Sequence, residues 1–388
     1  MIETRAIASL ETPALLLDPE KLKANVQRMH RRIAALDGVL RPHGKTAKSI
    51  DVMNLVSEAL GDAGLARSLQ SQGITVSTLA EAEYYAAHGY RDIVYAVGIA
   101  PNKLARVAAL LRQGVKLTVL LDSLAQVQFL MAAGEREQIS FGFLVEIDSD
   151  GHRAGIAADD PALLLIAEHA SESQWVEFRG VLTHAGGSYD CRSVDAIKAM
   201  AEQERNAMLH AVAALQKAGF TCEMVSLGST PTAQYAQSLE GMTEIRAGVY
   251  PFHDLVMAGL GVCQVEDIAI SVLTSVIGHH SGQLIIDAGW MALSRDRGTA
   301  QQAVDQGYGV VCDEQGHVMA DVIVSATNQE HGVVRHRHGH DLSAEEYPAG
   351  RLLRVLPNHA CATAAMFSAY QVIQDHERVQ AWPRINGW

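Results

Sequence analysis

The stretch 116–147, KLTVLLDSLAQVQFLMAAGEREQISFGFLVEI, contains two apolar runs separated by a segment long enough for a helix. The runs are Lys116–Leu121 and Phe141–Ile147. Short apolar runs that alternate with helical spacers are typical of βα units around a parallel sheet. This stretch therefore predicts a strand, a helix and a second strand, and the same alternation continues on both sides of it.

The alternation extends from about residue 39 to residue 249 and predicts eight strands. They are Val39–Pro42, Ile74–Thr78, Ile93–Val97, Lys116–Leu121, Phe141–Ile147, Phe178–Thr183, Met224–Leu227 and Glu244–Val249. Helices are expected over Ala80–Ala87, Asn102–Gln113 and Ser193–Lys217, the last of which closes at Gly219. Eight βα units predict an α/β fold, a (β/α)8 TIM barrel. A doubly wound open sheet is the alternative.

The pattern changes after about residue 256, where apolar runs are separated by polar turns that contain glycine. The runs are Ile268–Ile277, Gln283–Ile286, Gly309–Cys312, Val322–Ser325 and Arg351–Leu356. Without helical spacers they predict a second, mainly β domain that ends in a short helical tail. The expected division is therefore residues 1–255 for the barrel and 256–388 for the β domain, with the N-terminal strand joining the β domain.

Composition excludes several classes of partner. The chain has 388 residues, a net charge of −13, and 48% hydrophobic residues. The negative charge argues against nucleic acid and against anionic membranes, and no apolar run is long enough to cross a bilayer. The start of the chain shows no signal peptide, and five scattered cysteines fit a reducing compartment. We expect a cytoplasmic protein with a small-molecule partner, no nucleic acid and no membrane.

Polar residues follow five of the predicted strands at their carboxyl ends, where barrels of this kind carry their active sites. Each of these residues has an ordinary structural interpretation when it is taken alone, but all five segments meet at one end of one barrel. The segments are His43-Gly44-Lys45, Gly151-His152-Arg153-Ala154-Gly155, His184-Ala185-Gly186-Gly187, Gly228-Ser229-Thr230-Pro231, and Arg246-Ala247-Gly248 leading to Tyr250.

The segment after the seventh strand suits an anion. Small residues let backbone N–H groups approach a phosphate, the hydroxyls of Ser229 and Thr230 add donors, and a helix N-terminus follows. A phosphate there and a lysine after the first strand suggest a phosphorylated aldehyde cofactor held as a Schiff base. Lys45 is preferred over its neighbour Lys48 because it comes directly at the strand end.

His359 and Cys361 form a candidate metal pair in the β domain. Residues two positions apart on an extended segment project to the same side, so both side chains can reach one ion. A buried cysteine beside a structural histidine is the alternative. The run His336, His338 and His340 also has alternating histidines, but its arginines and glycine favour a solvated loop.

Five phrases of the sequence together resemble the metal-activated fold-type III pyridoxal-phosphate family, which has the alanine racemase fold and includes D-threonine aldolases and D-serine dehydratases. The phrases are Arg41-Pro42-His43-Gly44-Lys45-Thr46, Gly151-His152-Arg153-Ala154-Gly155, Thr183-His184-Ala185-Gly186, Gly228-Ser229-Thr230-Pro231-Thr232 and Pro357-Asn358-His359-Ala360-Cys361. The resemblance covers essentially the whole chain.

The resemblance implies roles for individual residues. It implies pyridoxal 5'-phosphate on Lys45, a homodimer, and a divalent metal (Mn, Mg, Co or Zn) on His359 and Cys361. The remaining implied contacts are Arg153 near the phenolic oxygen, His184 beside the ring, Gly228, Ser229 and Thr230 at the phosphate, Arg246 and Tyr250 at the pyridine nitrogen or phosphate, and Tyr189 at the substrate.

The resemblance also implies a reaction on the β-hydroxyl of a D-3-hydroxy amino acid. Aldolases of the family tend to carry Asp where this chain has Cys361, so the thiolate favours a dehydratase. The expected substrate is D-threo-3-hydroxyaspartate, which would give oxaloacetate and ammonia. Its second carboxylate would need a cation, for which Arg41 and Arg295 are candidates, and ordinary surface arginines are the alternative interpretation of both.

Other activities remain open from the sequence. Cleavage of D-threonine to glycine and an aldehyde, or dehydration of D-serine, would use the same residues. A non-catalytic protein that carries the cofactor is a further alternative, and the metal pair and the large second domain argue against it.

Overall fold

A computed structural model describes residues 4–62, 64, 73–375 and 378–388 of the chain. The chain forms two compact units. The barrel unit consists of Gln27–Met53, Leu60–Gly248 and Gly387–Trp388, and the β unit consists of Met1–Val26, Asn54–Ala59 and Val249–Asn386. Helices α1 (Pro19–Ala34) and α2 (Ile50–Asp62) each contribute residues to both units.

Parallel strands form the wall of the barrel unit in the order β3-β11-β10-β9-β7-β6-β5-β4. Their bounds are β3 (Leu40–Pro42), β4 (Ile74–Val76), β5 (Asp92–Gly98), β6 (Lys116–Leu121), β7 (Phe141–Asp148), β9 (Val176–Thr183), β10 (Met224–Leu227) and β11 (Glu244–Ala247). A parallel bridge between His43 and Thr75 joins the first strand to the last, and Gly44 N–H donates to the Thr75 carbonyl at 2.8 Å. The ring closes, so the predicted TIM barrel is confirmed and the open doubly wound sheet is wrong.

The apolar runs are strands because they are buried on both faces. In β7 every residue from Phe141 to Ile147 is buried, and in β6 every residue after Lys116 is buried. A parallel strand covered by helices outside and side chains inside reads as a continuous apolar run instead of an alternating one. The short strand β8 (Ile156–Ala157), which pairs with β7, lacks such a run and was not predicted.

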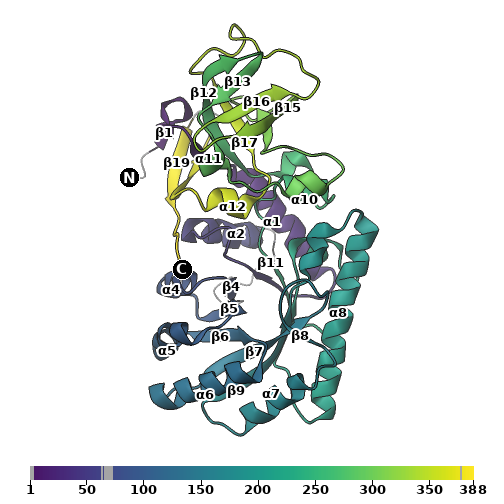
Figure 1. Ribbon diagram of the computed structural model, residues 1–388. Coiled ribbons are helices and arrows are strands. Elements are labelled where there is room, and N and C mark those ends of the chain that lie inside the picture. The colour runs from purple at the N-terminus through teal and green to yellow at the C-terminus, as the bar shows by residue number, and fades with distance from the viewer. Residues whose placement is uncertain (1–3, 63, 65–72, 376–377) are drawn as a thin grey trace. The chain divides into compact units, whose positions relative to one another are not determined.

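Helices follow the strands of the barrel unit, as Figure 1 shows for α4 to α8. Their bounds are α4 (Leu79–Ala87), α5 (Leu104–Arg112), α6 (Leu124–Glu137), α7 (Ala162–Ser171), α8 (Val194–Lys217) and α9 (Thr230–Tyr235), with short 3-10 helices η2 (Pro101–Lys103) and η3 (Gly186–Asp190). The predicted long helix is α8. The Ser193 side chain accepts a hydrogen bond from Ala196 N–H at its start, and Gly219, with φ +90°, lies just past its end.

The β unit contains a sheet with strand order β1-β19-β18-β2-β12-β13-β16-β15-β14-β17. The bounds are β1 (Thr4–Ala6), β2 (Ala14–Leu17), β12 (Ile270–His280), β13 (Gln283–Ile286), β14 (Val310–Cys312), β15 (Val318–Thr327), β16 (Gly332–His336), β17 (Leu352–Leu356), β18 (Ala369–Ile373) and β19 (Arg378–Pro383). An additional antiparallel pairing of β12 with β17 closes the strands from β12 to β17 into a small barrel. The predicted second, mainly β domain is confirmed.

The predicted helical tail is wrong. Residues after the short helix α12 (Ala360–Ala364) form the antiparallel pair β18–β19, which pairs with β2 and β1 from the start of the chain. The alternation of half-buried and buried residues in β18 is the pattern of a strand with one covered face. Strand β16 was also not predicted, and it pairs with β13 and β15.

Short helices complete the β unit. They are η1 (Ile7–Ser9), α10 (Leu255–Gly259), η4 (Val265–Asp267), α11 (Trp290–Leu293), η5 (Gly298–Gln301) and α12. In the part of the chain that the structure describes, no helix combines the length and the apolar composition that a bilayer crossing requires.

Candidate active site

Two lysines follow β3, and their surroundings differ. The amine of Lys48 lies 3.3 Å from Glu81 Oε1, and Glu81 is completely buried. Lys48 also has φ +46°, which holds it in the left-handed region. Lys45 forms no ion pair with any residue that the structure describes. An amine that must react with an aldehyde has to be free, so this geometry favours Lys45.

Two histidines lie in the electrostatic field of Lys45. Burial, followed by the charge of Lys45, lowers the pKa of His184 to about 3 and lowers that of His43 well below its usual value. Both rings are therefore neutral at physiological pH. His184 Nδ1 lies 3.1 Å from the Gly228 carbonyl, to which it can only donate, so Nε2 is the free acceptor of this ring. His43 Nδ1 accepts a hydrogen bond from Lys45 N–H at 3.3 Å.

The loop after β10 has the features of an anion cradle. Ser229 caps α9 by accepting from Thr232 N–H, and its hydroxyl lies 2.9 Å from that of Ser188. Thr230 Oγ1 is buried and has no hydrogen-bond partner among the described residues. Gly228 has φ +121°, and a Cβ there would lie 2.5 Å from the Arg246 carbonyl. The cradle depends on this glycine, because any side chain would push the loop away from β11.

A chain of buried polar contacts fixes Arg246 inside the barrel. Its Nη1 donates to Ser226 Oγ at 2.7 Å, and its Nη2 donates to the Thr183 carbonyl at 2.6 Å. Ser226 in turn donates to Glu244 at 2.7 Å. Burial lowers the pKa of Arg246 to about 10, which still leaves the guanidinium charged at neutral pH. The barrel thus holds a positive charge at a defined place on β11.

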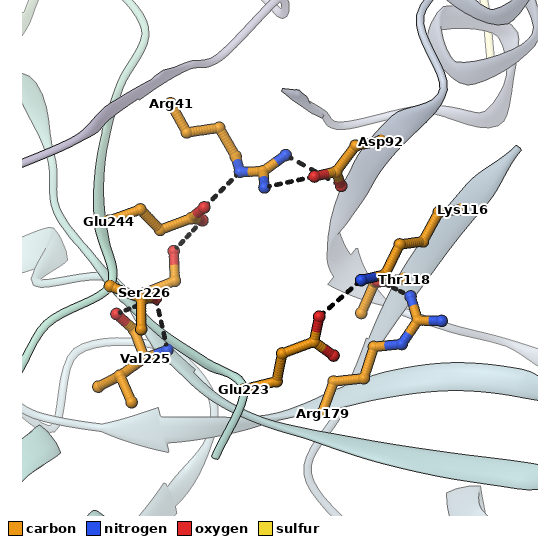
Figure 2. A network of polar contacts seen from close by, with 10 residues as sticks. Arg41, Asp92, Lys116, Thr118, Arg179, Glu223, Val225, Ser226 and Glu244 are labelled. Atoms are coloured by element: carbon orange, nitrogen blue, oxygen red, sulfur yellow. Dashed lines mark hydrogen bonds and ion pairs between the residues drawn. The ribbon is translucent and has the colours of Figure 1, made fainter. Parts of the chain in front are cut away.

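Arg41, one of the two candidates for the substrate's second carboxylate, is buried and paired with two carboxylates, so it is neither a substrate contact nor a surface arginine. Its Nε lies 2.6 Å from Glu244 Oε2 and its Nη2 lies 3.1 Å from Asp92 Oδ2 (Figure 2). Only 4% of its side chain is exposed. The carboxylates outweigh the effect of burial and raise the pKa of Arg41. A guanidinium with two carboxylate partners has a structural role and is not available to a substrate.

Arg41→Ala is expected to lower the free energy of unfolding by about 3–5 kcal/mol, because it leaves the buried Glu244 without its cation. Chemical denaturation followed by circular dichroism measures this. Arg106→Ala is the matched control, since Arg106 also forms an ion pair, with Glu83, but is 40% exposed, and it should cost about 1 kcal/mol or less. Equal losses in the two variants would contradict the structural role assigned to Arg41.

The other predicted contacts are distributed over both units. Arg153 is largely exposed, and its Nη2 lies 3.4 Å from Oε1 of the buried Glu146. Tyr189 lies in η3 with its ring centroid 6.5 Å from that of His184. Tyr250 is completely buried and belongs to the β unit. The roles of these residues toward a cofactor or substrate remain predictions.

The His359–Cys361 segment is not extended, and that prediction was wrong. His359 is the residue before α12 and Cys361 is the second residue within this helix. The two side chains nevertheless interact, and His359 Nδ1 lies 2.6 Å from Asp296 Oδ2. A carboxylate on one ring nitrogen orients the imidazole and leaves the other nitrogen for a metal. The start of a helix, and not a strand as predicted, brings the side chains of His359 and Cys361 together.

Charges around His359 reinforce this arrangement. Burial alone would lower the pKa of His359, but hydrogen bonds with Asp296 and Cys361 outweigh it and raise the pKa to about 11. The same hydrogen bond lowers the pKa of Asp296. Asp254, whose pKa burial raises, accepts from Ala360 N–H at 2.9 Å and so holds the start of α12. An arriving cation would replace the proton on His359, as metal binding to imidazole requires.

The donor set fits a divalent metal that accepts sulfur and nitrogen. Within the described residues there is no group of three or more His, Cys, Asp or Glu side chains arranged around one point, so water or substrate would fill the other positions. The alternating histidines do not form a competing centre. His336 ends β16 and its ring stacks on that of His340 at 4.3 Å.

Residues that the sequence did not single out support the candidate site. They are His43, Asp254, Asp296 and Glu204, the last of which accepts hydrogen bonds from Ala185 N–H and Gly228 N–H at 3.0 Å each. Ordinary local patterns would not have found them, since Asp296 is 63 residues from His359 and Glu204 lies in the middle of a helix. His43 was quoted in the motif that precedes Lys45, but no role was drawn from it.

The barrel mouth also fits a phosphorylated aldehyde. The unpartnered Thr230 hydroxyl can meet a phosphate. The closed parallel barrel, its free lysine and the separate β unit define a protein of the alanine racemase class.

Comparison with known proteins agrees with that class. The family model for the alanine racemase N-terminal domain matches residues 17–255, and the model for a putative serine dehydratase domain matches residues 269–373. D-threo-3-hydroxyaspartate dehydratase from Delftia sp. (strain HT23) is 47% identical over 386 residues, which are 98% of this chain and 99% of that protein. 3-Hydroxy-D-aspartate aldolase from Paracoccus denitrificans (strain Pd 1222) is 28% identical over 385 residues, which are 97% and 92% of the two chains.

The solved structure of the Delftia enzyme superposes with a TM-score of 0.93 and covers 99% of this chain and 100% of that one. The solved structure of a cysteine-to-alanine variant of D-threo-3-hydroxyaspartate dehydratase in the metal-free form also superposes with a TM-score of 0.93. The chain therefore belongs to the alanine racemase-like family that includes D-threo-3-hydroxyaspartate dehydratase.

Proposed function

We propose that this protein is a dehydratase of D-3-hydroxy amino acids that converts D-threo-3-hydroxyaspartate to oxaloacetate and ammonia, with pyridoxal 5'-phosphate and a divalent metal as cofactors. Identity of 47% over nearly the whole length of the Delftia dehydratase carries the proposal. The free amine of Lys45 and the thiol and imidazole of Cys361 and His359 supply the groups that such a reaction requires.

The barrel unit would hold the pyridoxal phosphate. Lys45 would bind the aldehyde, while Gly228, Ser229 and Thr230 would receive the phosphate. When bound, the conjugated ring withdraws the electrons that are left when a proton is removed from the α-carbon. The neutral His184, held by the Gly228 carbonyl, presents a flat and uncharged face, and Arg246 keeps a positive charge in place on β11.

Lys45 would act as the base. With cofactor and substrate bound, the amine of Lys45 would be the group that accepts the α-proton, at Nζ. His43 and His184 would stay neutral during this step, because burial lowers the pKa of both rings. Loss of the β-hydroxyl as water leaves an enamine, which hydrolyses to the 2-oxo acid and ammonia.

The β unit would hold the metal through His359 and Cys361, where it would supply Lewis acidity that makes the β-hydroxyl a better leaving group. Asp296 would keep the His359 ring oriented for this ion. With Arg41 excluded, Arg295 remains the candidate for the second carboxylate of the substrate. It is exposed, its guanidinium stacks on the Trp290 ring at 5.0 Å, and it forms no ion pair within the described part of the chain.

A substrate panel tests the reaction. The holoenzyme is incubated with D-threo-3-hydroxyaspartate, its L-enantiomer, D-serine and D-threonine, and oxaloacetate, pyruvate, ammonia and glycine are measured. Oxaloacetate and ammonia in equal amounts from the D-enantiomer alone are expected. Glycine as the main product would show the aldolase reaction of the Paracoccus relative, and pyruvate from D-serine as the faster reaction would make D-serine the substrate.

We propose further that the protein is a homodimer in the cytoplasm. The proposal rests on the family resemblance, and five cysteines without framework spacing are additional support for a reducing compartment. Light scattering coupled to gel filtration measures the mass, and a species of one chain at micromolar concentration would contradict the dimer.

A further inference from the structure

One buried acid of the barrel unit has no part in the chemistry above. Glu204 lies in the middle of α8 and is completely buried, and burial raises its pKa. Carboxyl groups are almost never fully buried unless the protein gives them partners. Its partners include two backbone N–H groups of the barrel mouth, those of Ala185 and Gly228, and the Thr232 side chain also hydrogen-bonds to this carboxyl group.

Both bonds end on the same oxygen. Glu204 Oε1 accepts from Ala185 N–H at 3.0 Å and from Gly228 N–H at 3.0 Å. Ala185 directly follows His184 after β9, and Gly228 directly follows β10. One oxygen atom on a helix therefore holds the ends of two neighbouring strands at a fixed separation.

Gly228 is held on its other side as well, because its carbonyl accepts from His184 Nδ1 at 3.1 Å. Glu204, residues 184–185 and Gly228 thus form a closed ring of hydrogen bonds, and the His184 imidazole is one of its links. A Cβ at Gly228 would lie 2.5 Å from the Arg246 carbonyl oxygen, so only glycine lets the loop approach β11 this closely.

We propose that Glu204 is a positioning residue, which sets the plane of His184 and the start of the Gly228–Thr230 loop by accepting both N–H groups on one carboxyl oxygen. Its importance for catalysis rests on the proposed function, in which His184 and this loop receive the cofactor. Its effect on the backbone positions of Ala185 and Gly228 is independent of the proposed function. Glutamine can offer the same carbonyl oxygen to both donors, whereas leucine has a similar volume and no acceptor.

Hydrogen exchange of the cofactor-free protein tests the backbone effect, through peptides that contain residues 185 and 228. In Glu204→Leu these two amides should exchange about tenfold faster or more, since each loses its acceptor, while Glu204→Gln should match the original protein. Met208→Ala is the matched control. Met208 is completely buried one turn further along α8, and its truncation weakens helix packing without removing either hydrogen bond.

The proposal would be overturned if the two amides in Glu204→Leu exchanged at the rate of the original protein. It would also be overturned if Met208→Ala, at matched stability, accelerated their exchange equally. The third contradicting result would be the same fast exchange in Glu204→Gln as in Glu204→Leu. For the holoenzyme we expect kcat to fall about 10²-fold in Glu204→Leu with a changed visible circular dichroism band, and both to recover in Glu204→Gln. Altered exchange in a protein that dehydrates no D-3-hydroxy amino acid would leave the positioning role intact and reject the proposed function alone.

Discussion

Lys45→Ala is expected to reduce kcat/KM by about 10³-fold or more, since a positioned acid or base alone contributes about 10²–10⁴-fold and this variant also loses the covalent hold on the cofactor. Borohydride reduction of the loaded protein, digestion and mass spectrometry should then find no modified lysine. The original protein should carry one phosphopyridoxyl group, on the peptide that contains Lys45.

Lys48→Met is the control for this experiment. Lys48 is only three residues away, but its amine is committed to the buried carboxylate of Glu81 at 3.3 Å. This variant should keep the covalent label on Lys45 and most of its activity, at some cost in stability because Glu81 loses its cation. A label on Lys48 in the Lys45→Ala protein would show that the two lysines were assigned in the wrong order.

The sequence predicts the strands of the barrel well because the physical signal is local. A strand covered on both faces must be apolar throughout, as Phe141–Ile147 is, and helices of ordinary length separate such strands. Closure of the sheet is less local. It depends on the bridge between His43 and Thr75, which no periodicity reveals, and only the count of eight strands pointed to it.

Strands β18 and β19 were missed for the same reason. β18 pairs in parallel with β2, so that Gln371 is opposite Leu16, and β19 pairs with β1. A pairing across more than 300 residues leaves only a weak alternation in each short strand. An apolar alternation over only five residues, Ala369–Ile373, is too short to distinguish a strand from a helical tail in the sequence.

In the candidate site, residues at strand ends could be predicted and their partners could not. Lys45 follows β3 and Ser229 follows β10, so their position in the barrel is implied by the fold. Arg41 looked equally available in the sequence, yet its partner Glu244 is 203 residues away and buries it. Whether a charged residue serves a ligand or the core is decided by contacts of this kind.

The metal pair gives the second large effect. His359→Ala and Cys361→Ala are expected to purify without bound metal and to lose about 10²–10³-fold in the rate of dehydration, because a Lewis acid contributes several kcal/mol to the departure of hydroxide. Metal analysis of the purified proteins and the oxaloacetate assay measure the two effects. EDTA should produce the same loss in the original protein, and added Mn²⁺, Mg²⁺, Co²⁺ or Zn²⁺ should restore activity to different extents and so identify the metal.

A graded series separates a metal ligand from a histidine that only stabilises the fold. Asp296→Asn keeps His359 but removes the carboxylate from its Nδ1, so metal affinity should fall about 10–100-fold and added metal should restore activity. His317→Ala is the matched control, because His317 Nδ1 also contacts a carboxylate, that of Asp313 at 3.0 Å, on an exposed turn. Metal retained by His359→Ala, or a failure of excess metal to rescue Asp296→Asn, would show that His359 and Cys361 are structural. In that case the Cys361 thiol could not be the group that favours loss of water over cleavage of the carbon chain.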